Sequence, residues 1–214
     1  MSKGKPTTRP YDATSRRSAA NENKLLIASA ARQLFTKQGY VATTITQISV
    51  EASVAAPTVY AVFGSKAAIL ESLITDAVND PDVPDHQDWM DAALAAPTAA
   101  ERIDHFARGS TRILNRAGDV FAVLHEAKFA DPDLVPKWED GQSRRLDGVS
   151  RFVGALHDDD LVAADMNLGA AIDVIWSLTS PEVYTLLVER RQWPPDRYGT
   201  WLAASIDDAL GHAS

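Results

Sequence analysis

The chain has 214 residues, of which 45% are hydrophobic and none is cysteine. This composition can bury a core, but without cysteine it can form neither a disulfide framework nor a thiolate metal site. The N-terminal residues contain no signal-peptide run, and no apolar run approaches the roughly 20 residues that a membrane-spanning helix needs, so we expect a cytoplasmic protein with no membrane partner.

The net charge of −8 is distributed unevenly. Residues 1–66 carry nine basic and three acidic residues, whereas residues 67–214 carry 12 basic and 26 acidic ones. The first segment therefore has a net charge of +6 and the second of −14. This asymmetry favours a phosphate-binding N-terminal end on an otherwise acidic protein. A basic tail on an acidic protein would give the same balance, so charge alone leaves both interpretations open.

The first elements of the chain are an arm and a helix. Residues 1–20 contain two prolines and several basic residues without apolar periodicity, which predicts a flexible basic arm. Over residues 22–38 the apolar residues recur at helical spacing, and Gly39 follows where a helix stop is expected. The pattern predicts an amphipathic helix that ends before this glycine.

Two short helices follow. Thr44 lies three residues before Gln47, the spacing of a capping box, which predicts a helix over about residues 45–52. Pro57 fits the first turn of a third helix over residues 56–62. Two short helices across a tight turn, with a longer helix on each side, form a helix-turn-helix unit.

The remaining chain also reads as helix. Ser65 can cap a fourth helix that ends near Asn79, and the segment "NDPDVPD" that follows is the best candidate for a domain boundary. We find no strand signal beyond it, so the sequence predicts an all-α fold. Further helices are expected at about residues 86–95, 99–116, 118–130, 132–156, 161–179, 181–191 and 194–211.

The segment "TTITQISVEASVAAPTVYAVFGSKAAIL", which begins at Thr43, carries the most specific pattern in the chain. Together with the helix before it, the run from residue 25 to residue 73 resembles the DNA-binding domain of TetR/AcrR-type transcriptional regulators. The resemblance implies an N-terminal three-helix helix-turn-helix DNA-binding domain at residues 21–66. It also implies a C-terminal helical ligand-binding and dimerisation domain at residues 67–214.

The resemblance assigns roles on a double-stranded DNA operator. It places the third helix in the major groove, with Tyr60 and Lys66 on backbone phosphates. Helix starts and nearby hydroxyl groups attract phosphate, which agrees with this assignment. The alternative is that Tyr60 is a half-buried packing residue and Lys66 a solvated charge. The candidate DNA-binding residues are Arg16, Arg17, Thr44, Thr46, Gln47, Ala55, Ala56, Pro57, Thr58, Tyr60 and Lys66.

The third helix departs from the family pattern at two positions. Ser53 stands where the family usually has glycine, and Ala55 stands where a serine or threonine commonly caps the helix. The helix also exposes no Arg, Asn or Gln, so it cannot make bidentate contacts to guanine or adenine. We expect apolar contact with thymine methyl groups instead, helped by polar residues of the second helix. The arm can add minor-groove contacts through Arg16 and Arg17, or it can be plain disorder.

In the family the C-terminal helices form a ligand pocket and a dimer. We expect a homodimer through the helices at about 161–179 and 195–211, since the first of these is apolar on nearly all sides and needs a cover. A central helix of a monomer is the alternative. The candidate ligand-binding residues are His125, Trp138, Gln142, Trp176 and Tyr184, each of which can instead be a core residue.

These expectations describe a ligand-responsive regulator that binds a pseudo-palindromic operator. We expect a repressor that is released by an unknown small-molecule effector, largely apolar or aromatic; an activator of the same fold is the alternative. A small helical enzyme is a rival, because "HDDD" and "HE" could offer metal ligands. "HEAKF" lacks the second histidine of a zinc helix, however, and no nucleophile with a nearby base is apparent, so we expect no metal, no cofactor and no catalysis. A helix-turn-helix protein that binds protein is a second rival.

Overall fold

The structure is a computed structural model, and it describes residues 13–79 and 88–211. Within these residues every regular element is helical and no strand occurs, which confirms the all-α prediction. The first elements are α1 (Ala13–Gln38), α2 (Ile45–Glu51), α3 (Ala56–Phe63), α4 (Lys66–Val78) and α5 (Asp88–Ala95). The later ones are α6 (Ala99–Ala127), η1 (Pro132–Leu134), α7 (Val135–Asp158), α8 (Leu168–Leu178), α9 (Pro181–Tyr184), η2 (Thr185–Arg190) and α10 (Pro195–Ala209).

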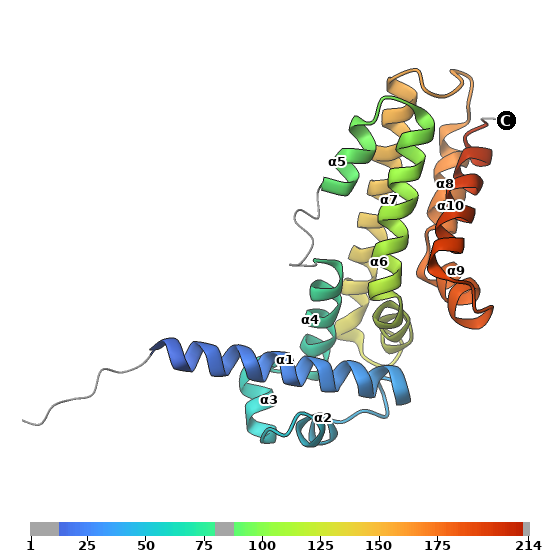
Figure 1. Cartoon of the computed structure of the whole chain (residues 1–214). Coiled ribbons are helices and arrows are strands. Elements are labelled where there is room, and N and C mark those ends of the chain that lie inside the picture. The colour runs from blue at the N-terminus through green and yellow to red at the C-terminus, as the bar shows by residue number, and fades with distance from the viewer. Residues whose placement is uncertain (1–12, 80–87, 212–214) are drawn as a thin grey trace, which may run out of the picture.

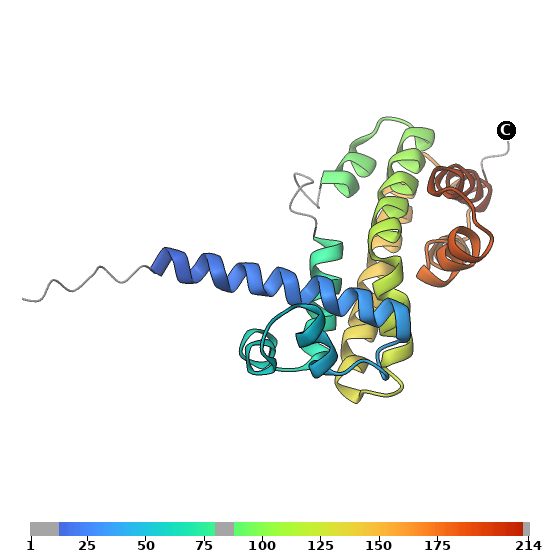
Figure 2. The ribbon, with the colours of Figure 1, turned by 60° about the horizontal axis from the view of Figure 1, so that its bottom comes forward.

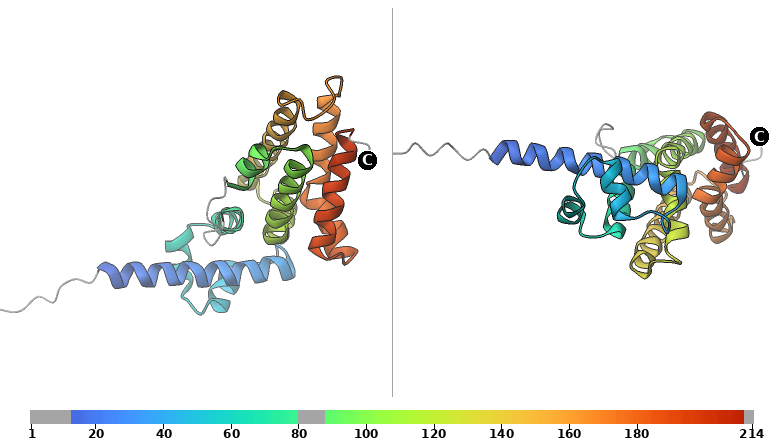
Figure 3. Two further views of the ribbon diagram at one scale, coloured as in Figure 1. Left: turned by 45° about the horizontal axis from the view of Figure 1, so that its top comes forward. Right: turned by 90° about the horizontal axis from the view of Figure 1, so that it is seen from below.

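The helices form two parts that differ in direction. Helix α1 lies across one end of the molecule, with α2 and α3 beneath it as drawn in Figure 1, and its first turns project beyond the other helices. Helices α6 and α7 rise from that end (Figures 1 and 2). Helices α8 and α10 pack together on one flank, and α5 lies on the other (Figure 3). No helix of the described residues is long and apolar enough to span a bilayer.

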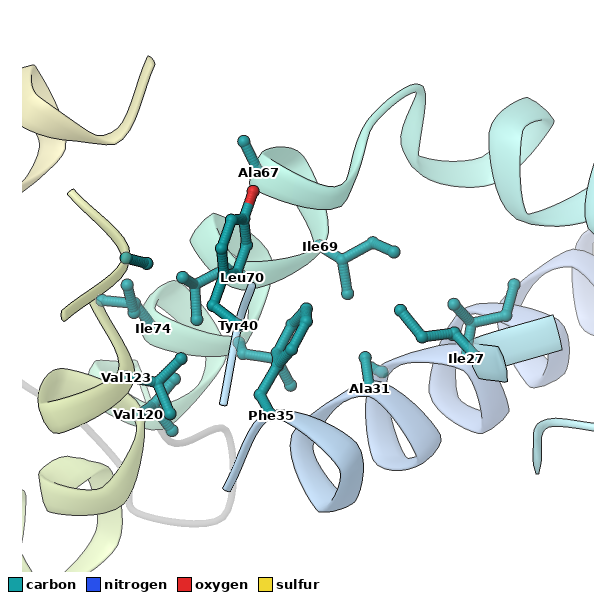
Figure 4. Packing of buried hydrophobic residues seen from close by; sticks show 14 of the residues in the cluster. Ile27, Ala31, Phe35, Tyr40, Ala67, Ile69, Leu70, Ile74, Val120 and Val123 are labelled. Carbon is teal, nitrogen blue, oxygen red and sulfur yellow. The ribbon is translucent and has the colours of Figure 1, made fainter. Parts of the chain in front are cut away.

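Two apolar clusters hold these parts together. The first cluster contains residues of helices α1 through α4 and of the last turns of α6. Figure 4 shows Phe35 and Tyr40 next to side chains of α4 and to Val120 and Val123 on α6. The second cluster contains residues of helices α5 through α10, among them Phe106, which also lies on α6. Because α6 contributes residues to both clusters, it connects the two parts of the molecule.

Helix α1 begins earlier than predicted. The sequence-based arm of residues 1–20 overlaps α1, which starts at Ala13, so Arg16 and Arg17 belong to a helix and only residues 1–12 lie outside the described part. Residues 13–21 carry no apolar stripe, and periodicity could not reveal them. No proline or glycine interrupts residues 13–38, however, and helix propensity alone permits the continuation.

Helix α6 is continuous where two helices were predicted, at 99–116 and 118–130. The predicted break fell at residue 117, next to Gly118, a residue type that disfavours the helix by about 1 kcal/mol relative to alanine. In the structure the ring of Tyr184 packs over this glycine, and a Cβ there would lie 3.4 Å from the ring. The glycine therefore serves close packing between α6 and α9, and it does not end the helix.

The C-terminal helices are shorter than predicted. Helix α8 starts at Leu168 and not at residue 161, because the side chain of Asn167 caps it by accepting a hydrogen bond from Ala170 N. Asparagine is favoured at this position and disfavoured inside helices. Ser180 caps α9 as expected, but the α-helix ends at Tyr184 and continues as the π-helical turn η2. The proposed dimerisation helix near 161–179 is therefore confined to Leu168–Leu178.

Candidate DNA-binding surface and effector cavity

The caps of the helix-turn-helix unit agree with the sequence. The hydroxyl of Thr44 accepts a hydrogen bond from Gln47 N at 3.2 Å, and the side-chain oxygen of Gln47 accepts one from Thr44 N at 2.9 Å. This reciprocal pair is the predicted capping box of α2. At the start of α4, the hydroxyl of Ser65 accepts a hydrogen bond from Ala68 N. Both helices that flank α3 therefore have fixed starts.

Helix α3 has a weaker start, as its two departures from the family pattern predict. Ala55 occupies the N-cap position and makes no side-chain hydrogen bond there. Ser53, in the turn between α2 and α3, has a φ of +55°, which costs a non-glycine residue on the order of 1 kcal/mol. Gly64, with a φ of +79°, ends α3 without that cost.

The candidate DNA-binding side chains gather on one end of the molecule. Tyr60 is 55% exposed on α3. Thr44, Thr46, Gln47, Ala55 and Pro57 are exposed as well, and Ala56 and Thr58 are half-buried. Their contacts with a duplex remain predictions, as do those of Arg16 and Arg17.

Lys66 has an anchored side chain, which neither sequence interpretation anticipated. Its ammonium group donates hydrogen bonds to the carbonyl oxygens of Tyr40 at 2.8 Å and Thr43 at 2.9 Å. It also lies 4.0 Å from the centroid of the Tyr40 ring. Burial lowers the pKa of Lys66, while Asp131 acts in the opposite direction. The lysine thus ties α4 to the loop before α2, and one of its three N–H groups stays available to a phosphate.

The same loop is connected to the C-terminal part. The hydroxyl of Tyr40 donates a hydrogen bond of 2.6 Å to the carboxylate of Asp131, at the turn between α6 and α7. Burial, followed by this contact with Asp131, raises the pKa of Tyr40, so the phenol stays protonated. A second link joins Arg32 on α1 to both carboxylate oxygens of Asp119 on α6, at 2.9 and 2.7 Å. These contacts join the DNA-binding unit to α6 and to the turn after it.

A cavity of about 310 Å³ lies in the C-terminal part. Its walls come from α4 through Ile74 and Val78, from α5 through Trp89, and from α6 and α7. Most of the lining is apolar or aromatic, and the volume is at the lower end of the range for small-molecule sites. The ring of Trp89 lies directly against Gly109 of α6, where no larger residue would fit.

The structure distributes the predicted ligand-binding residues over three places. Trp138 and Gln142 line the cavity, as predicted. His125 lines a separate cleft beside α9, and the centroid of its ring lies 4.7 Å from the centroid of the Trp138 ring. Trp176 lies behind the cavity wall, and Tyr184 is buried in the second cluster with its hydroxyl on Asn115 at 2.9 Å. We therefore assign Tyr184 to the core, because its polar group already has a protein partner.

Three cations of α7 line the cavity and were missed from the sequence: Lys137, Arg144 and Arg145. Positions 138, 142, 145 and 149 follow one another at helical spacing, so Arg145 could have been placed on the same face as Gln142. Leu146, four residues after Gln142, also fits apolar helical spacing, but it is exposed in the structure.

The expected dimerisation helix has an exposed face. Val174 is 45% exposed on α8, next to the small or polar residues Ala170, Asp173 and Ser177, whereas Ala171 and Ile175 face the core. The helix is therefore not buried on all sides within one chain. On α10, Tyr198, Leu202 and Ile206 are buried.

Known proteins share the helix-turn-helix segment and the helical fold described above. Residues 27–73 match the family model described as bacterial regulatory proteins, tetR family. A structure from Mesorhizobium loti, described as a TetR-family transcriptional regulator, has a TM-score of 0.66 at 17% identity, with 90% of this chain and 97% of that chain covered. Residues 27–73 therefore form a TetR-type DNA-binding domain, and the whole chain shares the fold of these TetR-family structures. TetR-family proteins are DNA-binding transcriptional regulators, not enzymes.

Two further structures share the fold. The fatty acid degradation regulator FadR from Bacillus halodurans has a TM-score of 0.68 at 17% identity, covering 88% of this chain and 95% of that chain. A transcriptional regulator from Pseudomonas aeruginosa PAO1 has a TM-score of 0.69 at 15% identity, covering 94% and 96%. No curated protein matches the chain significantly. Among residues 13–79 and 88–211, no three His, Asp or Glu side chains gather as metal ligands.

Proposed function

We propose that the protein is a transcriptional repressor that binds a pseudo-palindromic operator as a homodimer and releases it when a small effector fills the cavity. One observation carries this proposal. Helix α4 begins at Lys66, which braces the helix-turn-helix unit, and it lines the cavity near its other end through Ile74 and Val78. A single helix of about 20 Å thus connects the two sites.

The DNA-binding step follows from the exposed surface. Tyr60 and the remaining N–H group of Lys66 bind phosphates and fix the register, while Ala56, Pro57 and Thr58 approach base edges. Thr46 and Gln47 approach from α2. Because α3 offers no bidentate donor, phosphate contacts and apolar contacts with thymine methyl groups supply most of the affinity. This predicts a strong dependence of operator affinity on salt.

The dimer follows from the uncovered flank of the C-terminal part. Helices α8 and α10 pack side by side, and α8 presents Val174 with small neighbours to the outside. A partner that covers this flank would place two α3 helices about one DNA turn, or a multiple of it, apart. Binding to DNA would place this regulator in the cytoplasm of a bacterium.

Release follows from differential binding. An effector lowers operator affinity only if it binds more tightly to the form in which the two recognition helices are wrongly spaced. Contact with Ile74 and Val78 gives the effector a direct interaction with α4. The hydrogen bonds of Lys66, Tyr40 and Arg32 then transmit a displacement of α4 or α6 to the helix-turn-helix unit.

The decisive experiment is a footprint on the DNA upstream of its own and of the neighbouring genes, repeated at several salt concentrations. We expect protection of a palindrome, increased transcription of the adjacent gene when the protein is absent, and a dimer in analytical ultracentrifugation. Decreased transcription in its absence would indicate an activator. A lack of salt-sensitive binding to any of these duplexes, or a monomer at micromolar concentration, would contradict the proposal.

A further inference from the structure

The cavity wall formed by α7 is unusual in its charge. Residues 67–214 have a net charge of −14, yet among the described residues the cavity lining includes Lys137, Arg144 and Arg145 and no aspartate or glutamate. Arg144 is paired with Asp140 at 2.7 Å, and both side chains are more than half exposed. The other two cations make no ion pair with any described residue. A positive wall in an acidic domain indicates selection of a negatively charged occupant.

Arg145 has the most restrained side chain of the three. Its guanidinium group stacks on Trp176 at 4.3 Å and donates one N–H to the Trp176 carbonyl oxygen. Two further N–H groups donate to the side-chain oxygen of Gln142, at 3.3 and 3.1 Å. A guanidinium has five N–H donors, so two remain beside the cavity. Gln142 lines the cavity as well, and its side-chain NH₂ group is a hydrogen-bond donor.

The charge of Arg145 is not balanced by its surroundings. Burial lowers the pKa of this guanidinium to about 10, an effect that Glu182 partly opposes from beyond ion-pair distance. The group is therefore still charged at neutral pH, at a cost in desolvation. A partly buried cation that forms no ion pair at contact distance is costly to the free protein, and an anion that enters the cavity lowers that cost.

The rest of the cavity fixes the other half of the ligand. Trp89 and Phe106, together with Phe121 and Leu124, form an apolar lining opposite the cationic wall. Such a surface excludes a small inorganic anion as a good occupant, because an anion alone would leave the aromatic walls unfilled.

From these observations we infer that the effector is an amphipathic organic anion, whose carboxylate binds Arg145 and whose aliphatic or aryl body fills the apolar part of the cavity. Carboxylate suits the two free N–H groups because a guanidinium binds it in a bidentate geometry. This inference deepens the proposed function and rests on it, since the cavity is the effector site.

The test uses the full-length dimer and matched probes. Binding of medium-chain carboxylates from hexanoate to decanoate, and of an aryl carboxylate such as 4-phenylbutyrate, is measured by calorimetry against the alcohol and the amine of the same carbon skeleton. We expect the carboxylate to bind at least about tenfold more tightly than its alcohol, because hydrogen bonds between charged groups are stronger than those to a neutral hydroxyl. The amine should bind most weakly.

Variants identify the residue responsible. Arg145→Met should remove the preference for carboxylate over alcohol, and Arg145→Lys should keep part of it because the charge remains but the bidentate geometry is lost. Arg151→Met is the matched control, since Arg151 lies on the same helix, is exposed and pairs with Asp91 outside the cavity. A folding control is the apo melting temperature, which we expect Arg145→Met to leave unchanged or raise.

Outcomes separate this inference from the proposed function. Equal binding of alcohol and carboxylate, a carboxylate preference that survives Arg145→Met, or no binding by any carboxylate of the series would overturn the inference. Operator binding without effector is measured on the same samples. If the wild-type protein binds the operator while the inference fails, the repressor proposal still holds. If the wild-type protein does not bind the operator at all, the proposed function itself is refuted.

Discussion

The helix-turn-helix unit and the helical part that carries the cavity are held in place by different kinds of interaction. In the first, local hydrogen bonds fix the starts of two helices: Thr44 with Gln47 caps α2, and Ser65 caps α4. In the second, long helices meet through side chains far apart in sequence, such as Phe106 and Phe152, whose rings stack at 4.1 Å. The binding surface for DNA is thus built from local signals, and the cavity is built from tertiary packing.

The two regions also differ in how their charges are used. On the DNA-binding side a lysine is anchored on carbonyl oxygens and keeps one donor for phosphate. In the cavity an arginine is anchored in the same manner on Gln142 and the Trp176 carbonyl oxygen, and keeps two donors. In both cases the protein holds a cation rigidly beside an open space, which lowers the entropy lost when an anion binds.

The largest expected effect tests whether the two regions fold as one. Phe35→Ala empties a site in the first cluster, and Phe152→Ala empties one in the second; both side chains are fully buried. Each should lower the free energy of unfolding by about 3–5 kcal/mol, as measured in urea. Because α6 belongs to both clusters, each variant should still unfold in one transition. Two separate transitions in Phe35→Ala would show that the regions are independent.

The next effect separates function from stability within the first region. Tyr60→Phe removes an exposed hydroxyl, so the melting temperature should stay within error, while operator affinity should fall by about tenfold or more. Fluorescence anisotropy with the footprinted duplex measures this. Val50, which is exposed on α2 and outside the candidate surface, gives the control Val50→Thr. Unchanged affinity in Tyr60→Phe would remove this residue from the interface.

Alkaline pH gives an effect of intermediate size in both regions. Burial raises the pKa of Tyr40 and of Tyr198 above the ordinary value of 10.0. Below pH 10 both the folded and the unfolded chain keep these protons, and stability is unaffected. Above pH 10 only the unfolded chain loses them, so stability should fall by up to about 1.4 kcal/mol per pH unit and per tyrosine.

The matched variants assign this loss to one region or the other. Tyr40→Phe and Tyr198→Phe should each make the fall above pH 10 less steep, while each costs about 1 kcal/mol at neutral pH through a lost hydrogen bond to Asp131 or to the Leu178 carbonyl oxygen. Urea unfolding at a series of pH values measures both terms. An alkaline slope equal to that of the wild type would contradict the assignment.

The smallest effect concerns a single cap. Thr44→Ala should destabilise the protein by about 1 kcal/mol, because the capping box of α2 loses one partner. Thr46→Ala, two residues further and equally exposed, should leave stability unchanged and alter only operator binding. Equal losses of stability in the two variants would show that the box contributes nothing to the fold.

The sequence predicted the first region closely because its signals are local. The bounds of α2 and α3, the capping box, the positive φ near Ser53 and the missing cap at Ala55 all follow from residues within four positions of one another. The helical class of the second region was also predictable, since apolar periodicity extends along it. The first turns of α1 were not predictable, because residues 13–21 carry no apolar stripe that periodicity can detect.

By itself, the sequence determined the all-helical class, the family of the DNA-binding unit and the residues that this unit exposes. Tertiary structure alone decided that α6 continues through residue 117 without a break, that Tyr184 belongs to the core, and that Lys66 and Arg145 are anchored cations. The physical reason is the range of the interactions. Caps and turns act between neighbours in the chain, whereas a cavity and its charge depend on which distant helices meet.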